Sequence, residues 1–348
     1  MAFINFQPKD YFNTVLWSGN STGDNANQNI TGVGFQPDFF WNKSRNQAEN
    51  NIITDVLRGT NKFLRANDTT AEYTPTCNQT PISDGFTATG DEGGEFNNNG
   101  FTYATWNLKA NGAGSSNTDG SITSTVSAST TSGFSIVKWT GSGGNATIGH
   151  GLGVVPKMII IKSLANTTSW MVYTAMTGNN SEIALNTTAS ATGSSTAWQD
   201  TDPTSSVFYV AGGAGDGVNA SGDYVAYCFA NIRGFSKFGE YTGNENADGT
   251  FVYTGFKPAF VMIKNRGSAG KDWFIHDNKR LGYNDKNYGL FPNLTNAEAT
   301  DINLDLLSNG FKLRRSTAQL NHNGNFYIFM AFAESPLVGS NNIPATAR

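Results

Sequence analysis

The sequence contains few charged residues: Asp, Glu, Lys and Arg make up only 14% of its 348 residues, and the net charge is −4. Proteins that bind nucleic acid draw much of their affinity from clustered lysine and arginine, which neutralise phosphates. With 23 basic against 27 acidic residues, this chain lacks such an excess. We therefore expect no nucleic-acid partner.

Cysteine is also scarce. The only two cysteines, Cys77 and Cys228, fall at places that do not match when the chain is compared with itself. A disulfide framework needs paired cysteines at regular spacings. We expect no disulfide here, but two small buried residues.

Long apolar runs are missing as well. Apolar runs such as that from Met158 to Ile161 are far shorter than the roughly 18 residues of a membrane-spanning helix. The opening residues have no basic flank followed by an apolar stretch, so no secretion signal is expected. These features predict a soluble protein that is made in a cytoplasm and is not inserted into a membrane.

Motifs for catalysis and metal binding are not found. The chain has no Gly-x-Ser-x-Gly motif and no phosphate-binding loop, and its three histidines are not spaced as metal ligands. Asp91, Glu92 and Glu95 offer carboxylates for a glycosidase pair or a calcium site, but they lie in a Gly- and Asn-rich stretch without the spacing of a calcium loop. A solvated turn is the favoured interpretation. We expect no enzyme, no metal and no cofactor.

Two histidines have neighbours that invite a catalytic interpretation. His150 lies between two glycines ahead of an apolar run, where a loop histidine held by its own turn is favoured. His276 precedes Asp277, and adjacent residues of a strand point to opposite faces. We therefore expect neither histidine to act in catalysis.

The chain is rich in aromatic and small polar residues instead. Aromatic residues make up 12% of it, 24 of them Phe, and Asn, Thr, Ser and Gly take the place of charge. Disordered chains are poor in aromatics, whereas strands favour aromatic and β-branched residues. The composition indicates folded β structure, and the length suits several domains.

One motif occurs three times. A Gly stands three residues before a Pro, an apolar run follows, and a Lys closes the run six residues after the Pro. The copies are Gly34, Pro37 and Lys43; Gly153, Pro156 and Lys162; and Gly255, Pro258 and Lys264. Because Pro donates no hydrogen bond, it belongs at the start of a strand. The short apolar run that follows it indicates a strand buried on both faces.

Other blocks recur in the same order around this motif, including a closing aromatic strand, and such internal similarity predicts tandem repeats. Short strands separated by Gly-, Asn- and Asp-rich turns predict an all-β protein of three tandem antiparallel β-sandwiches of jelly-roll kind. The expected boundaries are an N-terminal segment at 1–12, repeats at 13–110, 132–235 and 236–336, a linker at 111–131 and a C-terminal tail at 337–348. The alternating residues Ile122 to Ser127 indicate a bridging strand within the linker.

Tryptophan raises the question of sugar binding, because an aromatic face stacks on a sugar ring. Trp17 and Trp139 share one repeat position, and Trp170 and Trp273 share another. Equivalent positions are what packing in a core predicts. Trp198 lies outside every matched block and is the candidate for an exposed contact.

Several stretches resemble a known family. They are the opening from Phe3 to Thr14, the stretch from Gly32 to Asp38, the stretch from Gly149 to Lys157 and the ending from Ala331 to Pro336. They resemble a repeat family of tailed-bacteriophage proteins of unknown function, common in marine and cyanobacterial phages and often labelled tail fibre or virion structural protein. The likeness covers essentially the whole chain and brings no active site with it.

The resemblance implies a virion structural protein, most simply a tail fibre or tail appendage involved in host attachment without catalysis. It implies other virion proteins as partners, a homo-oligomer with the trimer typical of phage fibres, and a host surface glycan or protein as receptor. The protein would be assembled in the host cytoplasm and located in the virion. Phe3, Phe6, Tyr11 and Phe12 form the candidate attachment interface, with packing on the chain's own first domain as an equal alternative.

Other functions stay open at this point. A capsid decoration or head-fibre protein would be served equally well by a stack of β domains. A glycan depolymerase would need a cleft with paired carboxylates, which the motifs do not supply. A carbohydrate-binding module would show an exposed aromatic platform. The position on the particle, the receptor and the oligomeric state are left undetermined.

Overall fold

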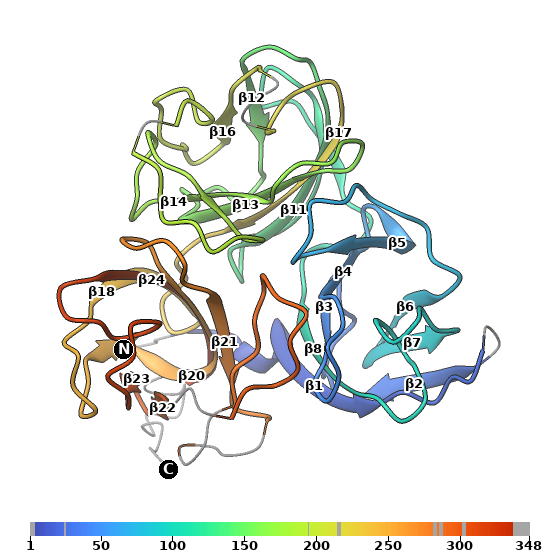
Figure 1. Ribbon diagram of the computed structural model, residues 1–348. Coiled ribbons are helices and arrows are strands. Elements are labelled where there is room, and N and C mark those ends of the chain that lie inside the picture. The colour runs from blue at the N-terminus through green and yellow to red at the C-terminus, as the bar shows by residue number, and fades with distance from the viewer. Residues whose placement is uncertain are drawn as a thin grey trace.

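The computed structural model describes residues 4–23, 26–193, 195–213, 217–280, 284, 288–300 and 304–336. The all-β prediction is confirmed: among these residues there is no α-helix, only one 3-10 turn, η1 (Pro8–Asp10), and 24 strands. None of the described segments is a helix that could cross a membrane. The strands form three lobes around a common centre, drawn in blue, green and orange in Figure 1.

Each lobe consists of a large and a small antiparallel sheet. In the first lobe the large sheet has the order β1 (Phe12–Ser18), β8 (Thr102–Leu108), β3 (Phe39–Ser44), β4 (Ile52–Asp55) and β5 (Gly59–Arg65). Its small sheet has the order β2 (Asn27–Thr31), β7 (Gly85–Thr89) and β6 (Asn78–Ile82).

The second lobe has the widest large sheet. Its order is β15 (Ile183–Ala184), β14 (Met171–Thr174), β13 (Met158–Ser163), β17 (Gly222–Phe229), β11 (Phe134–Gly141), β10 (Ser124–Ser129) and β9 (Ser115–Asn117). The small sheet pairs β12 (Ala146–Gly149) with β16 (Val207–Val210).

The third lobe contains the last strands of the chain. Its large sheet has the order β18 (Ser236–Thr242), β24 (Phe326–Pro336), β20 (Phe256–Asn265) and β21 (Trp273–Asp277). Its small sheet has the order β19 (Phe251–Tyr253), β23 (Gly310–Leu313) and β22 (Leu304–Leu307).

The lobes share one plan, as the predicted repeat requires. In each large sheet, the first strand that all three lobes have in common pairs with the closing strand. The closing strand pairs in turn with the motif strand, which gives β1-β8-β3, β11-β17-β13 and β18-β24-β20. A jelly roll sends the strand after the motif strand into the opposite sheet, whereas here β4, β14 and β21 stay beside it in the same sheet. The lobes are therefore two-sheet sandwiches, but their strand order departs from that of a jelly roll.

Stacked aromatic pairs mark the same place in each lobe. Ring centroids lie 4.6 Å apart for Trp17 and Tyr103, 5.3 Å for Trp139 and Tyr224, and 4.9 Å for Tyr241 and Tyr327. In each pair the two residues are also directly opposite each other in the register of neighbouring strands. Such cross-strand contacts stabilise sheets, which explains why these positions are aromatic in all three lobes.

Each large sheet is buried on both faces. In β17, Tyr224, Ala226 and Cys228 point into the core of the second lobe. The alternating residues Val225 and Tyr227 point the other way, into a core to which all three lobes contribute. The motif strands β3 and β13 are buried at every residue, so the prediction of two-sided burial is confirmed. We call this common cluster the shared core.

The segment 111–131 is not a linker. Residues 115–117 form β9 and residues 124–129 form β10, which extend the large sheet of the second lobe beyond β11. Val126 is buried on one face of β10, and serine and threonine occupy other positions of the strand. The Ser- and Thr-rich composition was misleading, whereas the alternation pointed to a strand.

The N-terminal aromatic residues pack on their own chain. Phe12 begins β1 and stacks on Phe332 in the shared core, with ring centroids 4.9 Å apart. Phe6 and Tyr11 both contact the ring of Phe235 edge-on. Of the candidate attachment interface, Phe12 is therefore a core residue and Phe6 and Tyr11 are partly buried, because η1 folds the segment against β24. Phe3 and the tail 337–348 lie outside the described residues.

Candidate functional site: the seams of a closed ring

The three motif lysines lie where neighbouring lobes meet. Lys43, Lys162 and Lys264 are fully buried, and each lies on the shared-core side of its strand. The Nζ of Lys43 donates to the carbonyl of Thr295 in the third lobe at 2.9 Å. A contact of this kind occurs at each of the three interfaces between neighbouring lobes, and we call these interfaces the seams.

The other two lysines repeat this contact in cyclic order. Lys162 of the second lobe donates to the carbonyl of Thr69 in the first lobe at 2.9 Å, and Lys264 of the third lobe donates to that of Thr187 in the second at 3.4 Å. Each lobe thus holds the lysine of the next one, and the third lobe holds that of the first. The three lobes form a closed ring within one chain.

The glycines and prolines of the motif have local roles. Gly34, Gly153 and Gly255 have φ values of 90°, 71° and 84°, in the left-handed region that favours glycine. Pro258 lies at a register shift between β20 and β24, where a missing N–H is tolerated. These residues turn the chain into the motif strand, and the lysine at its far end reaches the seam.

A second set of side chains crosses the seams eight or nine residues after each lysine. The Nε1 of Trp170 donates to the carbonyl of Arg65 at 2.9 Å, and that of Trp273 donates to the carbonyl of Ala184 at 3.0 Å. In the first lobe Asn51 takes this place, and its Nδ2 donates to the carbonyls of Phe291 and Leu294 at 3.0 Å. As expected, Trp170 and Trp273 are core residues, and their indoles also hold the ring closed.

Two seams contain a buried carboxylate with its own arginine. Asp55 accepts hydrogen bonds from Arg58 Nε at 2.5 Å and from the hydroxyl of Tyr227, across the seam, at 2.7 Å. Asp277 accepts from Arg280 Nε at 2.7 Å and from the indole of Trp106, across another seam, at 3.0 Å. A buried charge is tolerated when it is paired and hydrogen-bonded in this way.

The electrostatics of Asp277 follow from this pairing. Burial raises the pKa of a carboxyl group, but the Arg280 guanidinium and the hydrogen bonds that Asp277 accepts outweigh it, so that the pKa of Asp277 lies below its usual value. The carboxylate is therefore charged and already saturated with donors. It is a structural group and not a free acid or base.

The third seam replaces the whole carboxylate unit. Register places Thr174 opposite Met158, as Asp55 is opposite Phe39 and Asp277 opposite Phe260. The donors to Asp55 and Asp277, Tyr227 and Trp106, lie at one position in the closing strand of the next lobe. The residue at this position across the third seam is Met330, whose side chain has no hydrogen to donate. The arginine position is taken by Thr177. Carboxylate, arginine and donor have thus been exchanged together, which is what a functional unit of three groups predicts.

The motif lysines give the fold a pH dependence. Burial lowers the pKa of Lys43 to about 7, and those of Lys162 and Lys264 to about 8, whereas lysines of the unfolded chain titrate near 10.4. Between about pH 7.5 and pH 9 the unfolded chain therefore binds more protons, so that the free energy of unfolding increases with pH. Urea denaturation at several pH values should show the midpoint rising across this window.

A lysine variant is the control for this pH dependence. Lys162→Met removes one of the three titrating groups, and we expect its midpoint to rise less steeply than that of the unchanged chain. The raised pKa values of Cys77 and Cys228 oppose the effect within this window, because cysteines of the unfolded chain titrate near 8.5. Up to pH 9 the two cysteines offset the three lysines only in part, so the comparison ends there. A midpoint that falls between pH 7.5 and pH 9 would contradict the assignment.

The remaining predicted residues lie away from the seams. Trp198 is only 2% exposed, and its Nε1 donates to the carbonyl of Ser181 at 2.9 Å, so the prediction of an exposed contact is wrong. The ring of Trp198 meets Tyr173 edge-on within the core of the second lobe. Residues outside the matched blocks fold back over the open side of this sandwich, where the small sheet has only two strands.

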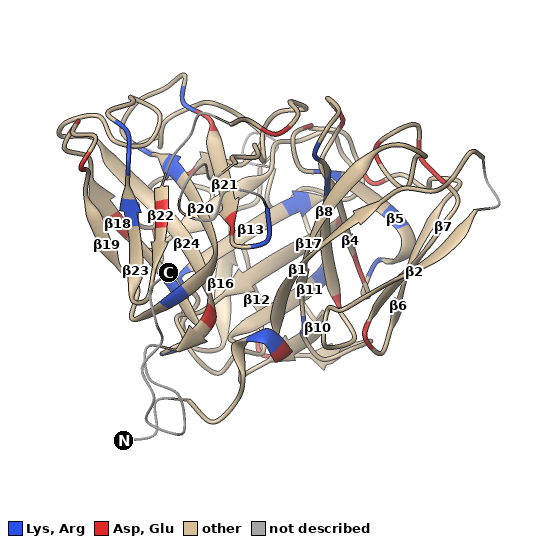
Figure 2. Cartoon of the chain, turned by 90° about the horizontal axis from the view of Figure 1, so that it is seen from below, with Lys and Arg blue, Asp and Glu red and all other residues tan. Residues whose placement is uncertain are grey.

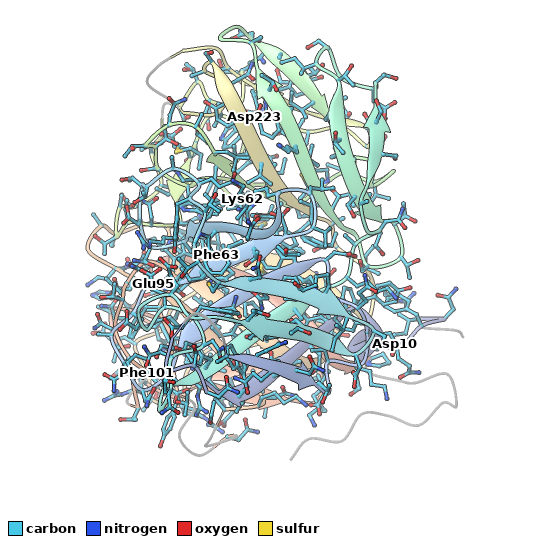
Figure 3. The ribbon with its side chains drawn as sticks, turned by 90° about the vertical axis from the view of Figure 1, so that its right-hand side faces the viewer. Asp10, Lys62, Phe63, Glu95, Phe101 and Asp223 are labelled. Carbon is cyan, nitrogen blue, oxygen red and sulfur yellow. The ribbon has the colours of Figure 1, made fainter. Side chains whose placement is uncertain are left out.

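The acidic cluster is not a simple solvated turn. Glu95 is buried and accepts hydrogen bonds from Arg65 at 3.1 Å, from the hydroxyl of Tyr73 at 2.7 Å, and from Asn50. Figure 3 shows Glu95 among the side chains of the first lobe, near Phe63, whose ring contacts that of Tyr73. Asp91 and Glu92 are half-buried. These hydrogen bonds occupy the carboxylate oxygens of Glu95.

The two histidines are buried and apart. His150 is held by its loop: its Nδ1 accepts from the backbone of Leu152 and its Nε2 lies 3.2 Å from the carbonyl of Thr204. Burial lowers the pKa of His276 to about 3, so its ring is neutral. His276 and Asp277 face opposite sides of β21, as the strand geometry predicted.

The described part of the chain contains no group of three metal-ligating side chains. Cys77 and Cys228 are free and buried, as the sequence predicted. Figure 2 shows that charged residues are thinly scattered over the lobes. The groups that sequence motifs single out serve to hold the lobes together, and the arrangement can keep three sandwiches in a fixed relation.

Comparison with known proteins gives one match. The model of a family described as a domain of unknown function, DUF7483, matches residues 7–336. No curated protein and no solved structure matches the chain.

Proposed function

This chain belongs to the DUF7483 family, and we propose that it is a structural protein without catalytic activity in the virion of a tailed bacteriophage. Its role would be that of a tail fibre or tail appendage that takes part in host attachment. Support comes from the resemblance of the opening, motif and closing stretches to tailed-phage proteins and from the geometry of the seams.

The closed ring is the observation that carries the structural role. Motif residues that could have formed a site instead bind carbonyls and side chains of the neighbouring lobe. Large sheets that are buried on both faces leave the small sheets and the loops as the outer surface. Such an architecture suits a rigid part that presents loops to a partner.

The ring also bears on the oligomeric state. Phage fibres present a threefold arrangement by associating three identical chains, whereas this chain supplies three similar lobes by itself. A single copy would therefore fit a threefold position on the particle. The homotrimer that the resemblance implies stays a prediction.

A capsid decoration protein is the alternative that the same observation supports, because a three-lobed ring also fits a threefold position on a capsid lattice. The two functions differ in where and how often the chain occurs. A tail appendage is present in a few copies, whereas a decoration protein covers the lattice.

Imaging of the particle tests the proposal. Cryo-electron microscopy of a phage that encodes this chain should show three-lobed density at the tail. Density repeated over the capsid would contradict the tail assignment and support the decoration protein. If mass spectrometry of purified particles finds no peptide of this chain, both assignments are wrong.

A further inference from the structure

The large sheets of the first and third lobes end in a long edge strand, β1 and β18. In the second lobe the corresponding strand, β11, is covered by β10, which pairs with it along residues 125–129. No described strand pairs with the outer side of β1 or β18. An uncovered edge presents N–H and C=O groups on which a strand of another chain can add. The first and third lobes therefore need another means of closing these edges.

Alternate residues of β1 direct their backbone groups to its outer side. Backbone hydrogen bonds join Tyr11 and Gly19, at the two ends of β1, to the chain of β8. The residues of an antiparallel pair alternate between those that bond to the partner strand and those that do not. Thr14, Leu16 and Ser18 are therefore the residues whose N–H and C=O groups point away from β8.

The same derivation applies to β18. Backbone hydrogen bonds join Phe235 and Gly243 to the chain of β24, so that Phe238, Glu240 and Thr242 direct their groups outward. The stacked aromatic pairs align these three residues with the three of β1, in the same order. The two edges can therefore be compared position by position.

Asparagine side chains cover the same backbone N–H on both edges. The Oδ1 of Asn13 accepts from the amide of Thr14 at 3.0 Å, and the Oδ1 of Asn231 accepts from the amide of Phe238 at 2.8 Å. In the second lobe the corresponding residue, Ile136, lies opposite β10. Asn13 adjoins its target, whereas Asn231 precedes its target by seven residues. Two asparagines from different repeat positions thus do what β10 does in the second lobe.

Other side chains cover the same backbone C=O at the far end of both edges. The Nε2 of Gln28 donates to the carbonyl of Ser18 at 2.9 Å. The hydroxyl of Thr250 donates to the carbonyl of Thr242, also at 2.9 Å. Each edge is therefore closed near both of its ends by side chains that come from outside the strand pattern.

We infer that Asn13 and Asn231 are edge caps, which prevent β1 and β18 from pairing with a second copy of this chain. Between the caps the edges differ: Leu16 is apolar and 37% exposed, whereas the corresponding residue of the third lobe is the exposed, charged Glu240. Charged side chains on an edge discourage pairing. The first lobe therefore depends more on its cap than the third. This inference goes beyond the virion role and does not depend on it.

The molar mass of the full chain in solution tests the inference. Size-exclusion chromatography with light scattering, at several protein concentrations, should give a constant mass for the unchanged chain. For Asn13→Ala the mass should rise with concentration to about double, because two β1 edges would pair in an isologous contact. Asn231→Ala should associate more weakly, because Glu240 remains on its edge.

A second substitution in the Asn13→Ala chain is the matched control. The Nδ2 of Asn13 also donates to the carbonyls of Gly32 and Val33, so the variant disturbs a loop as well as the edge. Adding Leu16→Lys restores neither bond but places a charge on the edge, as Lys138 does at the corresponding position of the second lobe. The double variant should regain the mass of the unchanged chain, which separates edge pairing from a disturbed loop.

The third lobe provides an independent variant should Asn13→Ala fail to fold. Asn231→Ala combined with Glu240→Leu creates an uncapped apolar edge there and should associate, whereas Glu240→Leu alone keeps its cap and should not. The inference is wrong if the uncapped variants keep the mass of the unchanged chain. It is also wrong if the unchanged chain associates as strongly as they do, or if Leu16→Lys leaves the association of Asn13→Ala unaltered.

Discussion

Asp55→Ala is expected to lower the free energy of unfolding by about 3–5 kcal/mol, the usual effect of breaking a buried ion pair. The substitution leaves Arg58, whose side chain is completely buried, without its closest partner, and leaves the Tyr227 hydroxyl across the seam without an acceptor. The backbone amides of Leu57 and Arg58 lose their acceptor as well. Urea denaturation followed by circular dichroism measures the loss.

The chain provides a matched control at the equivalent position of the second lobe. Thr174→Ala removes one weak acceptor, at 3.3 Å from the Met176 amide, and leaves no charge unpaired. We expect a loss of about 1 kcal/mol or less. Equal losses for the two variants would show that the carboxylate unit does not stabilise its seam.

Phe332→Ala is expected to lower the free energy of unfolding by about 3–5 kcal/mol, as for other fully buried phenylalanines. Phe332 lies in the third lobe. The centroid of its ring is 4.9 Å from that of Phe12 in the first lobe and 6.2 Å from that of Phe229 in the second lobe. The cavity would therefore weaken all three lobes. Hydrogen exchange should become faster in strands of every lobe.

Phe208→Ala is the control for this second result, because Phe208 is equally buried but lies in the core of the second lobe alone. Its additional exchange should be concentrated in β12 and β16 and in the sheet that they cover. If Phe332→Ala accelerated exchange in the third lobe only, the lobes would be independent domains and the shared core would not couple them.

The sequence supports much of the fold because its strongest signals are local. The Gly and Pro of each motif fix the entry into a strand, and the apolar run after Pro156 identifies burial on both faces. The closed ring was not predicted, because contacts such as that of Lys43 with Thr295 join residues far apart in the chain. A signal was present nevertheless: a lysine that ends an apolar run in all three copies needs a buried partner.

Two of the predictions that the structure contradicts share a cause. Trp198 and the segment 111–131 lie outside the blocks that recur, so self-comparison gave no position for them. The lack of a match favoured an exposed Trp198, and the composition of 111–131 favoured a linker. Insertions in a repeat must nevertheless cover whatever the shared plan leaves open. In the second lobe they cover the edge of β11 and the side of the sandwich with the short small sheet.

A ring that closes within one chain does not depend on protein concentration. Three separate subunits would dissociate on dilution, because association follows mass action. Here each lobe meets its neighbours at the effective concentration set by the connecting chain. One seam can also lose its carboxylate unit, as the seam at Thr174 has, while the other two keep the ring closed. Identical subunits could not divide the task in this way, since every change would appear at all three seams at once.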